Sequence, residues 1–199
     1  MEQSASNNKD IIQQWNINNT WTLFLDRDGV VNRRRIGSYI MMVDEFEFLP
    51  GVLQAFASAN KHFTKIVIVS NQQGIGKGLM TTQTLDQIHE FMISEVKDNN
   101  GRIDKVYYSP HLADSNHIMR KPNTGMAMAA AKDFPDISFK RSVMIGDSVT
   151  DMEFARALGM KAVFVGIPEE MDVNKDLFDV AYPSFSDFIK DLNTIVVNQ

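Results

Sequence analysis

Two aspartates, Asp26 and Asp28, come directly after the apolar run Trp21–Leu25. Such a run is typical of a buried strand, and a strand that ends in two acids is unusual because a carboxylate is costly to leave in a core. The two side chains must therefore face solvent, meet a cation or take part in chemistry. Gly29 lets the chain turn sharply after them. Because an Asp-x-Asp pair is also common in surface loops, its interpretation depends on the other segments.

Further polar residues suited to chemistry follow other apolar runs. They are Ser70 and Asn71 after Ile66–Val69, Arg120 and Lys121 at the end of the longer loop after Val106–Tyr108, and Asp147, with Asp151 one helical turn later, after Val143–Ile145. If these runs are strands of one parallel sheet, all of these side chains fall on one rim, beyond the carboxyl ends of the strands.

Apolar runs typical of strands alternate with helical patterns along most of the chain. The predicted strands are Thr22–Leu25, Ile66–Val69, Val106–Tyr108, Val143–Ile145 and Ala162–Val165, and the predicted helices are Gly51–Lys61, Thr82–Lys97, Thr124–Asp133, Ser148–Leu158 and Ser184–Leu192. This alternation predicts a Rossmann-like α/β domain with three layers, α/β/α, and a mostly parallel sheet. Thr81 or Thr82 is expected to cap the second helix, and Gly159 to end the fourth.

Composition indicates an ordinary globular domain. The 199 residues are 44% hydrophobic and 23% charged, carry a net charge of −5 and include no cysteine. The charge gives no footprint for nucleic acid, no apolar run approaches membrane-spanning length, and the missing thiols fit a reducing compartment. We expect a weakly ordered leader or surface helix over residues 1–19, a single domain over 20–199, a cytoplasmic location and a monomer.

Three acids, a hydroxyl–amide pair and a lysine suit phosphoryl transfer through an aspartyl-phosphate. Asp26 is the predicted nucleophile, since a carboxylate needs no deprotonation at neutral pH. Asp28 is the predicted general acid, which protonates the leaving alcohol and then activates water. These roles require two environments that separate the pKa values, with Asp26 ionised and Asp28 able to hold a proton.

An anionic nucleophile that attacks an anionic phosphate needs positive charge between them. Mg²⁺ can supply it, with carboxylate oxygens from Asp26 and Asp147 and the backbone oxygen of Asp28 as predicted ligands. Lys121 is expected to neutralise the phosphate oxygens, and Ser70 with the amides after it to donate hydrogen bonds to them. Asp151 is expected to orient the metal site or Lys121.

The motifs that carry this chemistry resemble those of the haloacid dehalogenase (HAD) superfamily of phosphatases. They occur in the expected order: DRDGVVN at 26–32, SNQQG at 70–74, RKP at 120–122 and GDSVTD at 146–151. Together with FEFLPGV at 46–52, they look most like the histidinol-phosphatase and heptose-bisphosphate phosphatase family. The resemblance implies a cytoplasmic, Mg²⁺-dependent sugar-phosphate phosphatase without a large cap domain, in which Arg120 helps to recognise the substrate.

Two features depart from the family pattern. Family members usually carry a zinc loop with cysteines before RKP, but here the thiol positions hold Ser109, His117 and Met119, and only His111 keeps a ligand type. Two histidines without a thiolate make a poor zinc site, so we expect no zinc and a loop held by packing. Ser148 also stands where the heptose-bisphosphate members tend to have a basic residue.

Several alternatives remain open at this stage. Arg33, Arg34 and Arg35 are either a grip for a second phosphate or a solvated charge run. Histidinol phosphate is an alternative substrate to a heptose bisphosphate, and a nucleic-acid 3′-phosphatase or a non-catalytic protein of the same fold is less favoured. His89, on the second predicted helix, is expected at the surface or at its boundary.

Overall fold

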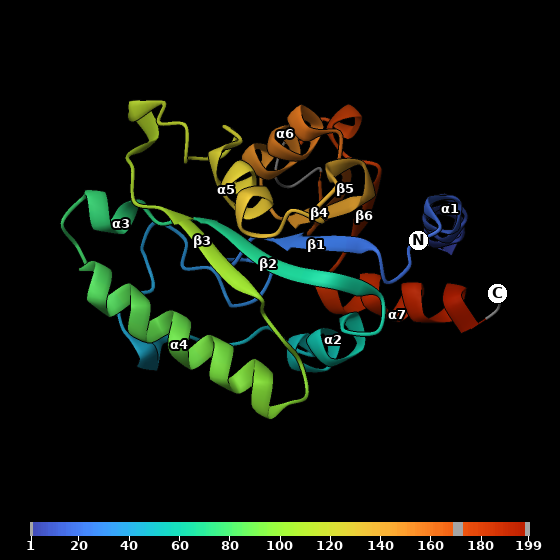
Figure 1. The fold of residues 1–199 in the computed structure, drawn as a ribbon, viewed down its shortest axis with the longest axis horizontal. Helices are drawn as coiled ribbons and strands as arrows, with labels where there is room; N and C mark the ends of the chain where they lie inside the picture. Colours follow the sequence, from blue (N-terminus) through green and yellow to red (C-terminus); the bar gives the residue numbers. More distant parts are fainter. Residues whose placement is uncertain (1, 169–172, 198–199) are drawn as a thin grey trace.

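Six strands form one parallel sheet in the order β3-β2-β1-β4-β5-β6 (Figure 1). The computed structural model describes residues 2–168 and 173–197. The strands are β1 (Trp21–Leu25), β2 (Phe63–Asn71), β3 (Lys105–Ser109), β4 (Ser142–Gly146), β5 (Lys161–Val165) and β6 (Val180–Tyr182). The five predicted strands are confirmed, and the sheet is parallel throughout.

Helices cover both faces of the sheet, which confirms the predicted three layers. The helices are α1 (Glu2–Trp15), α2 (Val52–Ala59), the short α3 (Gln73–Gly76), α4 (Thr82–Asp98), α5 (Gly125–Asp133), α6 (Val149–Leu158) and α7 (Phe185–Val197). In Figure 1, α5 and α6 lie on one face, and α2, α4 and α7 lie on the other. Thr81 caps α4 by accepting from the backbone N–H of Thr84, and Gly159 ends α6 in a left-handed conformation.

Successive residues of the central strand β1 point into two separate cores, as the pleat of a strand requires. Leu23 and Leu25 are fully buried in the core that also contains Phe56 of α2. Phe24 is fully buried in the other core, with Met126 of α5. Both faces of β1 are buried, so a charged side chain is tolerated only beyond its last residue, where Asp26 and Asp28 lie.

The N-terminal residues, for which the sequence left open a mobile leader or a weak surface helix, form α1. This helix contacts α7 and β6, and Ile12 and Trp15 are buried in the core on that side. Asn8 extends the contact with a 2.8 Å hydrogen bond from its side-chain nitrogen to the backbone oxygen of Ala181. The division into a leader and a domain at residue 20 stays a prediction.

The long connections that follow the carboxyl ends of β1 and β3 contain little regular structure. Between β1 and α2 the chain forms the 3₁₀ turn Val43–Glu45 and two isolated β-bridges at Asn32, and between β3 and α5 it forms the 3₁₀ turn Ala113–Ser115. The described residues therefore place no second sheet or helical bundle there, in agreement with the predicted fold without a large cap.

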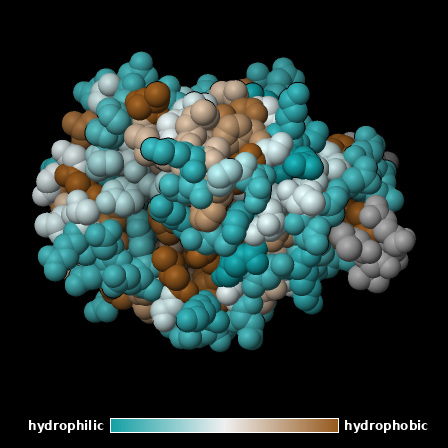
Figure 2. All heavy atoms as spheres, in the orientation of Figure 1, coloured by the Kyte–Doolittle hydropathy of each residue, from teal (hydrophilic) through white to brown (hydrophobic). Residues whose placement is uncertain are grey.

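None of the helices in the described ranges is long and apolar enough to cross a bilayer. Figure 2 shows a largely hydrophilic face with separate hydrophobic patches.

Candidate active site

The carboxyl ends of β1, β2 and β4 open into a cleft of about 1070 Å³. All eight predicted site residues line it: Asp26, Asp28, Ser70, Asn71, Arg120, Lys121, Asp147 and Asp151. The parallel register brings them together, since β1 pairs with β2 on one side and β4 on the other. The backbone N–H of Asp26 extends the pairing with β4 by donating to the oxygen of Ile145 at 2.9 Å.

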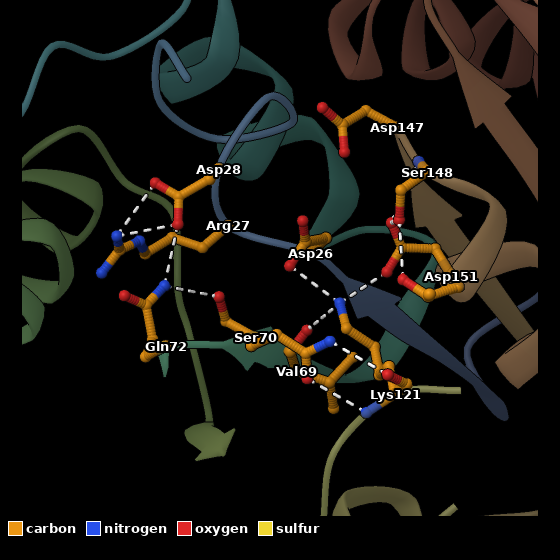
Figure 3. A network of polar contacts seen from close by, with 12 residues as sticks. Asp26, Arg27, Asp28, Val69, Ser70, Gln72, Lys121, Asp147, Ser148 and Asp151 are labelled. Carbon is orange, nitrogen blue, oxygen red and sulfur yellow. Dashed lines mark hydrogen bonds and ion pairs between the residues drawn. The ribbon is translucent and has the colours of Figure 1, made fainter. Parts of the chain in front are cut away.

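Lys121 is a buried cation at the centre of this site. Its Nζ lies 2.8 Å from Oδ1 of Asp26, 2.5 Å from Oδ1 of Asp151 and 2.6 Å from the backbone oxygen of Val69 (Figure 3). Burial alone would lower the pKa of Lys121, but the two carboxylates raise it above its usual value. The ammonium is therefore held charged, with each of its three donors directed at a defined oxygen.

Asp151 connects Lys121 to the beginning of α6. Its Oδ2 accepts hydrogen bonds from the backbone nitrogen of Ser148 at 3.1 Å and from the Ser148 hydroxyl at 2.6 Å. These two hydrogen bonds, both donated by Ser148, keep the completely buried carboxylate in place. Asp151 thus lies where it can orient Lys121, as one of the two roles expected for it requires. Ser148 bonds Asp151 at the beginning of α6.

Asp26, Asp147 and Asp151 form a cluster with too little positive charge. Each offers an oxygen, and these atoms lie within 4.8 Å of one another. Burial, together with the neighbouring acids, raises the pKa of Asp26 to about 6 and that of Asp147 to about 7. Hard oxygen donors at this spacing suit a divalent cation such as Mg²⁺. Gly29 permits the close approach, because a Cβ there would lie 2.0 Å from Oδ2 of Asp147.

Asp28 has an environment of the opposite kind. Nη2 of Arg27 donates to its two carboxylate oxygens at 2.9 and 2.8 Å, and the side-chain amides of Asn32 and Gln72 donate at 2.9 and 2.8 Å. Burial opposes the ionised form, but these donors and the Arg27 charge lower the pKa of Asp28 below its usual value. In the protein alone, the directions at Asp26 and Asp28 are thus the reverse of those expected from the sequence.

The sequence reasoning missed Arg27 and placed His89 wrongly. Arg27 is completely buried, with Nη1 3.4 Å from Nε2 of His89. His89 is 6% exposed instead of lying at the surface. Burial, helped by the Arg27 charge, lowers its pKa to about 3, so the ring is neutral and can accept from the guanidinium. The sequence did contain a signal for this burial, because Arg27 stands between Asp26 and Asp28 and a buried arginine needs acceptors nearby.

The residues at the end of β2 have more specific positions than their motif predicts. Gln72, which the sequence reasoning did not select, donates from Nε2 to Oδ2 of Asp28 and to Oγ of Ser70, both at 2.8 Å. A hydroxyl that accepts one hydrogen bond still has its own proton to donate. Asn71 bonds the backbone of Lys121 in both directions, at 3.0 and 3.1 Å, so the structure places it behind the lysine.

The loop before Lys121 is held by contacts among its own residues. The rings of His111 and His117 stack with centroids 3.3 Å apart, and Nδ1 of His117 accepts from the backbone N–H of Met119 at 3.1 Å. Rings stacked face to face direct their in-plane lone pairs side by side, which does not suit a shared metal ion. Within the described residues, the loop contains no group of three metal-ligand side chains. Arg120 donates from Nη1 to the backbone oxygen of His111 at 2.9 Å.

Comparison with known proteins identifies the family to which this site belongs. A HAD-hydrolase-like family model matches residues 118–185. A D-glycero-α-D-manno-heptose-1,7-bisphosphate 7-phosphatase from Mycobacterium bovis is 35% identical over 142 residues, 71% of this chain and 75% of that protein. A D-glycero-β-D-manno-heptose-1,7-bisphosphate 7-phosphatase from Rhodopseudomonas palustris is 33% identical over 158 residues, 75% of this chain and 85% of that protein.

A solved structure agrees over nearly its whole length. The crystal structure of D,D-heptose 1,7-bisphosphate phosphatase from B. bronchiseptica, complexed with magnesium and phosphate, gives a TM-score of 0.77 at 28% identity and covers 87% of this chain and 98% of that one. The chain belongs to the HAD-like hydrolases and, within them, to the family of the heptose 1,7-bisphosphate 7-phosphatases. It is accordingly a phosphatase, as the motifs indicated.

Proposed function

We propose that this phosphatase is Mg²⁺-dependent and hydrolyses a sugar phosphate through an aspartyl-phosphate on Asp26, with D-glycero-D-manno-heptose 1,7-bisphosphate as its substrate. The observation that carries the proposal is the position of the Asp26 carboxylate, which contacts the Lys121 ammonium at 2.8 Å and offers an oxygen within 4.8 Å of those of Asp147 and Asp151. The names of the relatives support the choice of sugar. They include both anomers, so the anomer preferred stays open.

The chain's own residues account for each bond that changes. An oxygen of Asp26 forms a bond to phosphorus while the bond from phosphorus to the sugar oxygen breaks, and Asp28 gives a proton to the leaving oxygen. Water then attacks phosphorus, passes a proton to Asp28 and releases phosphate from Asp26. Lys121, held charged by its two carboxylate partners, stabilises the negative charge on the phosphoryl oxygens.

Residues around Asp28 position the proton-transfer step. Gln72 joins Asp28 to Ser70, so the acid and the proposed phosphate-binding hydroxyl are linked by a single amide. The hydrogen bonds to Asp28 favour its ionised form in the protein alone, so Asp28 must take up its proton from solvent when the negative charge of the substrate raises its pKa.

The acidic cluster fits a magnesium ion, which would be held by Asp26, Asp147 and the backbone oxygen of Asp28. When bound, the ion supplies positive charge that permits two anions to approach each other. The pKa values of Asp26 and Asp147 are raised first by burial and then by neighbouring acids, and they support this assignment because a bound cation would offset both effects.

The decisive experiment measures phosphate release from heptose 1,7-bisphosphate by the purified protein, with Mg²⁺ and with EDTA. We expect turnover that requires Mg²⁺ and is faster than with histidinol phosphate, whose ammonium would face Arg34, Lys77 and Arg120 at the cleft. Equal or faster turnover of histidinol phosphate would reassign the substrate. Absence of Mg²⁺-dependent turnover of any phosphate ester would contradict the proposed function.

Arg120 and Asn71 belong to the proposal with separate roles. Arg120 lines the cleft and is proposed to contact substrate, whereas Asn71 would act by positioning Lys121. The cytoplasmic location, the monomeric state and the lack of a nucleic-acid partner stay predictions. Light scattering after gel filtration, and titration with a 3′-phosphorylated oligonucleotide, would test the last two.

A further inference from the structure

Three consecutive arginines on the loop after β1 have different surroundings. Arg33 bonds Glu47 at 3.0 and 3.1 Å, and Arg35 bonds Glu45 at 2.8 Å. Arg34 and Arg35 both line the cleft, but Arg34 pairs with an acid of the site, with its Nη1 3.2 Å from Oδ2 of Asp147. The two flanking pairs hold the loop, so the sequence alternative of a solvated charge run describes Arg33 well and Arg34 poorly.

The contact between Arg34 and Asp147 is one that can be exchanged. It is a single hydrogen-bonded ion pair, and the Arg34 side chain is 50% exposed. Pairs of this kind contribute little to stability, because water competes for both partners. Asp147, by contrast, is largely buried beside Asp26 and Asp151, and burial together with these acids raises its pKa even though Arg34 is in place. A divalent ion held by these acids would neutralise Asp147 more strongly than one guanidinium does.

We propose that Arg34 determines specificity by changing partners. Without a divalent ion it neutralises Asp147, and when the ion takes over that role Arg34 turns to a second anionic group of the substrate, distant from the phosphate that reacts. The inference deepens the proposed function and rests on it, since it assigns a residue to the recognition of bisphosphates over monophosphates.

The chemistry of the cleft supports a second anion there. A guanidinium offers five donors in a planar fork that matches two phosphate oxygens, and Arg34 uses one of its nitrogens on Asp147. Lys77 and Arg120 also line the cleft, and Lys77 lies 5.4 Å from the ring centre of Tyr39, another lining residue. The volume of about 1070 Å³ has room for a sugar with phosphates at both ends.

The first test compares two substrates for each variant. The measured quantity is kcat/KM for heptose bisphosphate divided by kcat/KM for p-nitrophenyl phosphate, which has a single phosphate. Arg34→Ala should lower this ratio about 10- to 100-fold, the range of one charge-assisted phosphate contact. Arg33→Ala, which removes a neighbouring charge outside the cleft, is the matched control and should keep the wild-type ratio. An unchanged ratio in Arg34→Ala would overturn the assignment.

The second test needs no turnover. Isothermal titration of Mg²⁺ into the substrate-free protein should give an affinity about two- to fivefold higher for Arg34→Ala than for wild type, because a competing cation is gone. Arg33→Ala should match wild type. Equal or weaker Mg²⁺ binding by Arg34→Ala would refute the exchange. If the wild type binds Mg²⁺ but hydrolyses neither substrate, the proposed function fails, while the titration still decides whether Arg34 competes.

Discussion

Asp26 and Asp28 stand two residues apart at the end of one strand, yet their surroundings are opposite. Asp26 shares the cation that it contacts, Lys121, with Asp151 and lies close to Asp147. Asp28 accepts from Nη2 of the Arg27 guanidinium with both of its carboxylate oxygens, and from two amide donors. Figure 3 shows the two groups on either side of Asp26, with the acids and Lys121 on one side and Asp28, Arg27 and Gln72 on the other.

The comparison shows that neighbours, and not residue type, assign the two roles. The side that lacks positive charge can take up a cation, because the ion would relieve its imbalance, and a bound cation would then attract an anionic phosphoryl group. The side that is already balanced holds its carboxylate in a fixed orientation. We therefore expect substitutions on the first side to alter catalysis and metal binding, and those on the second to alter stability as well.

The largest effect is expected for Asp26→Asn. The amide keeps the shape of the side chain but cannot attack phosphorus, so kcat should fall by at least about 10³-fold. The measurement is phosphate release under saturating substrate, with circular dichroism as the control for folding. Turnover near the wild-type rate in a folded Asp26→Asn protein would rule out the aspartyl-phosphate.

Arg27→Met tests the balanced side. The substitution leaves the largely buried Asp28 carboxylate without its guanidinium partner, and removal of one member of such a pair costs about 3–5 kcal/mol. Urea unfolding of wild type and variant at pH 7 gives the difference. The exposed pair Arg33 and Glu47 offers the control, since Arg33→Met should change the free energy of unfolding by less than about 1 kcal/mol. A similarly small loss in the free energy of unfolding of both variants would show that Asp28 does not depend on Arg27 for its charge balance.

The acid-rich side predicts a pH dependence of stability in the metal-free protein. The folded-state pKa values of about 6 for Asp26 and 7 for Asp147 lie above the ordinary 3.8. The folded protein therefore retains protons that the unfolded chain releases, and this contribution to stability is full below pH 3.8 and is lost as the pH rises through about 6 to 7.

Thermal unfolding in EDTA measures this contribution. Between about pH 5 and pH 8, the Tm of wild type should fall more than that of Asp147→Asn, which has one carboxylate fewer. Added Mg²⁺ should raise the wild-type Tm more at pH 8 than at pH 5, because it binds the ionised acids. Parallel Tm curves for the two proteins would show that Asp147 is not short of positive charge.

The smallest effect is expected at His89. Because its pKa is about 3, the ring stays neutral from pH 5 to pH 8 and serves only as an acceptor for Arg27. His89→Gln supplies another acceptor, so kcat/KM should keep the same pH profile and stability should change by about 1 kcal/mol or less. A shift of the profile in this variant would show that His89 titrates with the site.

The sequence predicted the framework and the positions of the acids well for a physical reason. Apolar runs that are buried on both faces, such as Val143–Ile145, leave a strong pattern, and the parallel topology then brings their ends together. The strand β6 was missed because Val180–Tyr182 is too short to form such a pattern. The helix α1 was uncertain because a few apolar residues, including Ile12 and Trp15, attach an otherwise polar segment.

Partners across the site were less predictable, since they depend on contacts between distant segments. Nothing local to Asp28 shows that Gln72, 44 residues later, bonds its carboxylate. Arg27 likewise has a buried partner in His89, which lies 62 residues later in helix α4. The donors around Asp28 lower its pKa and burial raises that of Asp26, which reverses the expected directions. The predicted site residues nevertheless line one cleft.

The two-way hydrogen bond between Asn71 and the backbone of Lys121 has a consequence for the loop before the lysine. It attaches the lysine to the end of a rigid central strand, so the preceding loop, residues 110–119, is not required to locate it. That loop can therefore close on the stacked pair of His111 and His117 while the ammonium keeps its place. The position of the charge and the conformation of the neighbouring loop are thereby set by separate contacts.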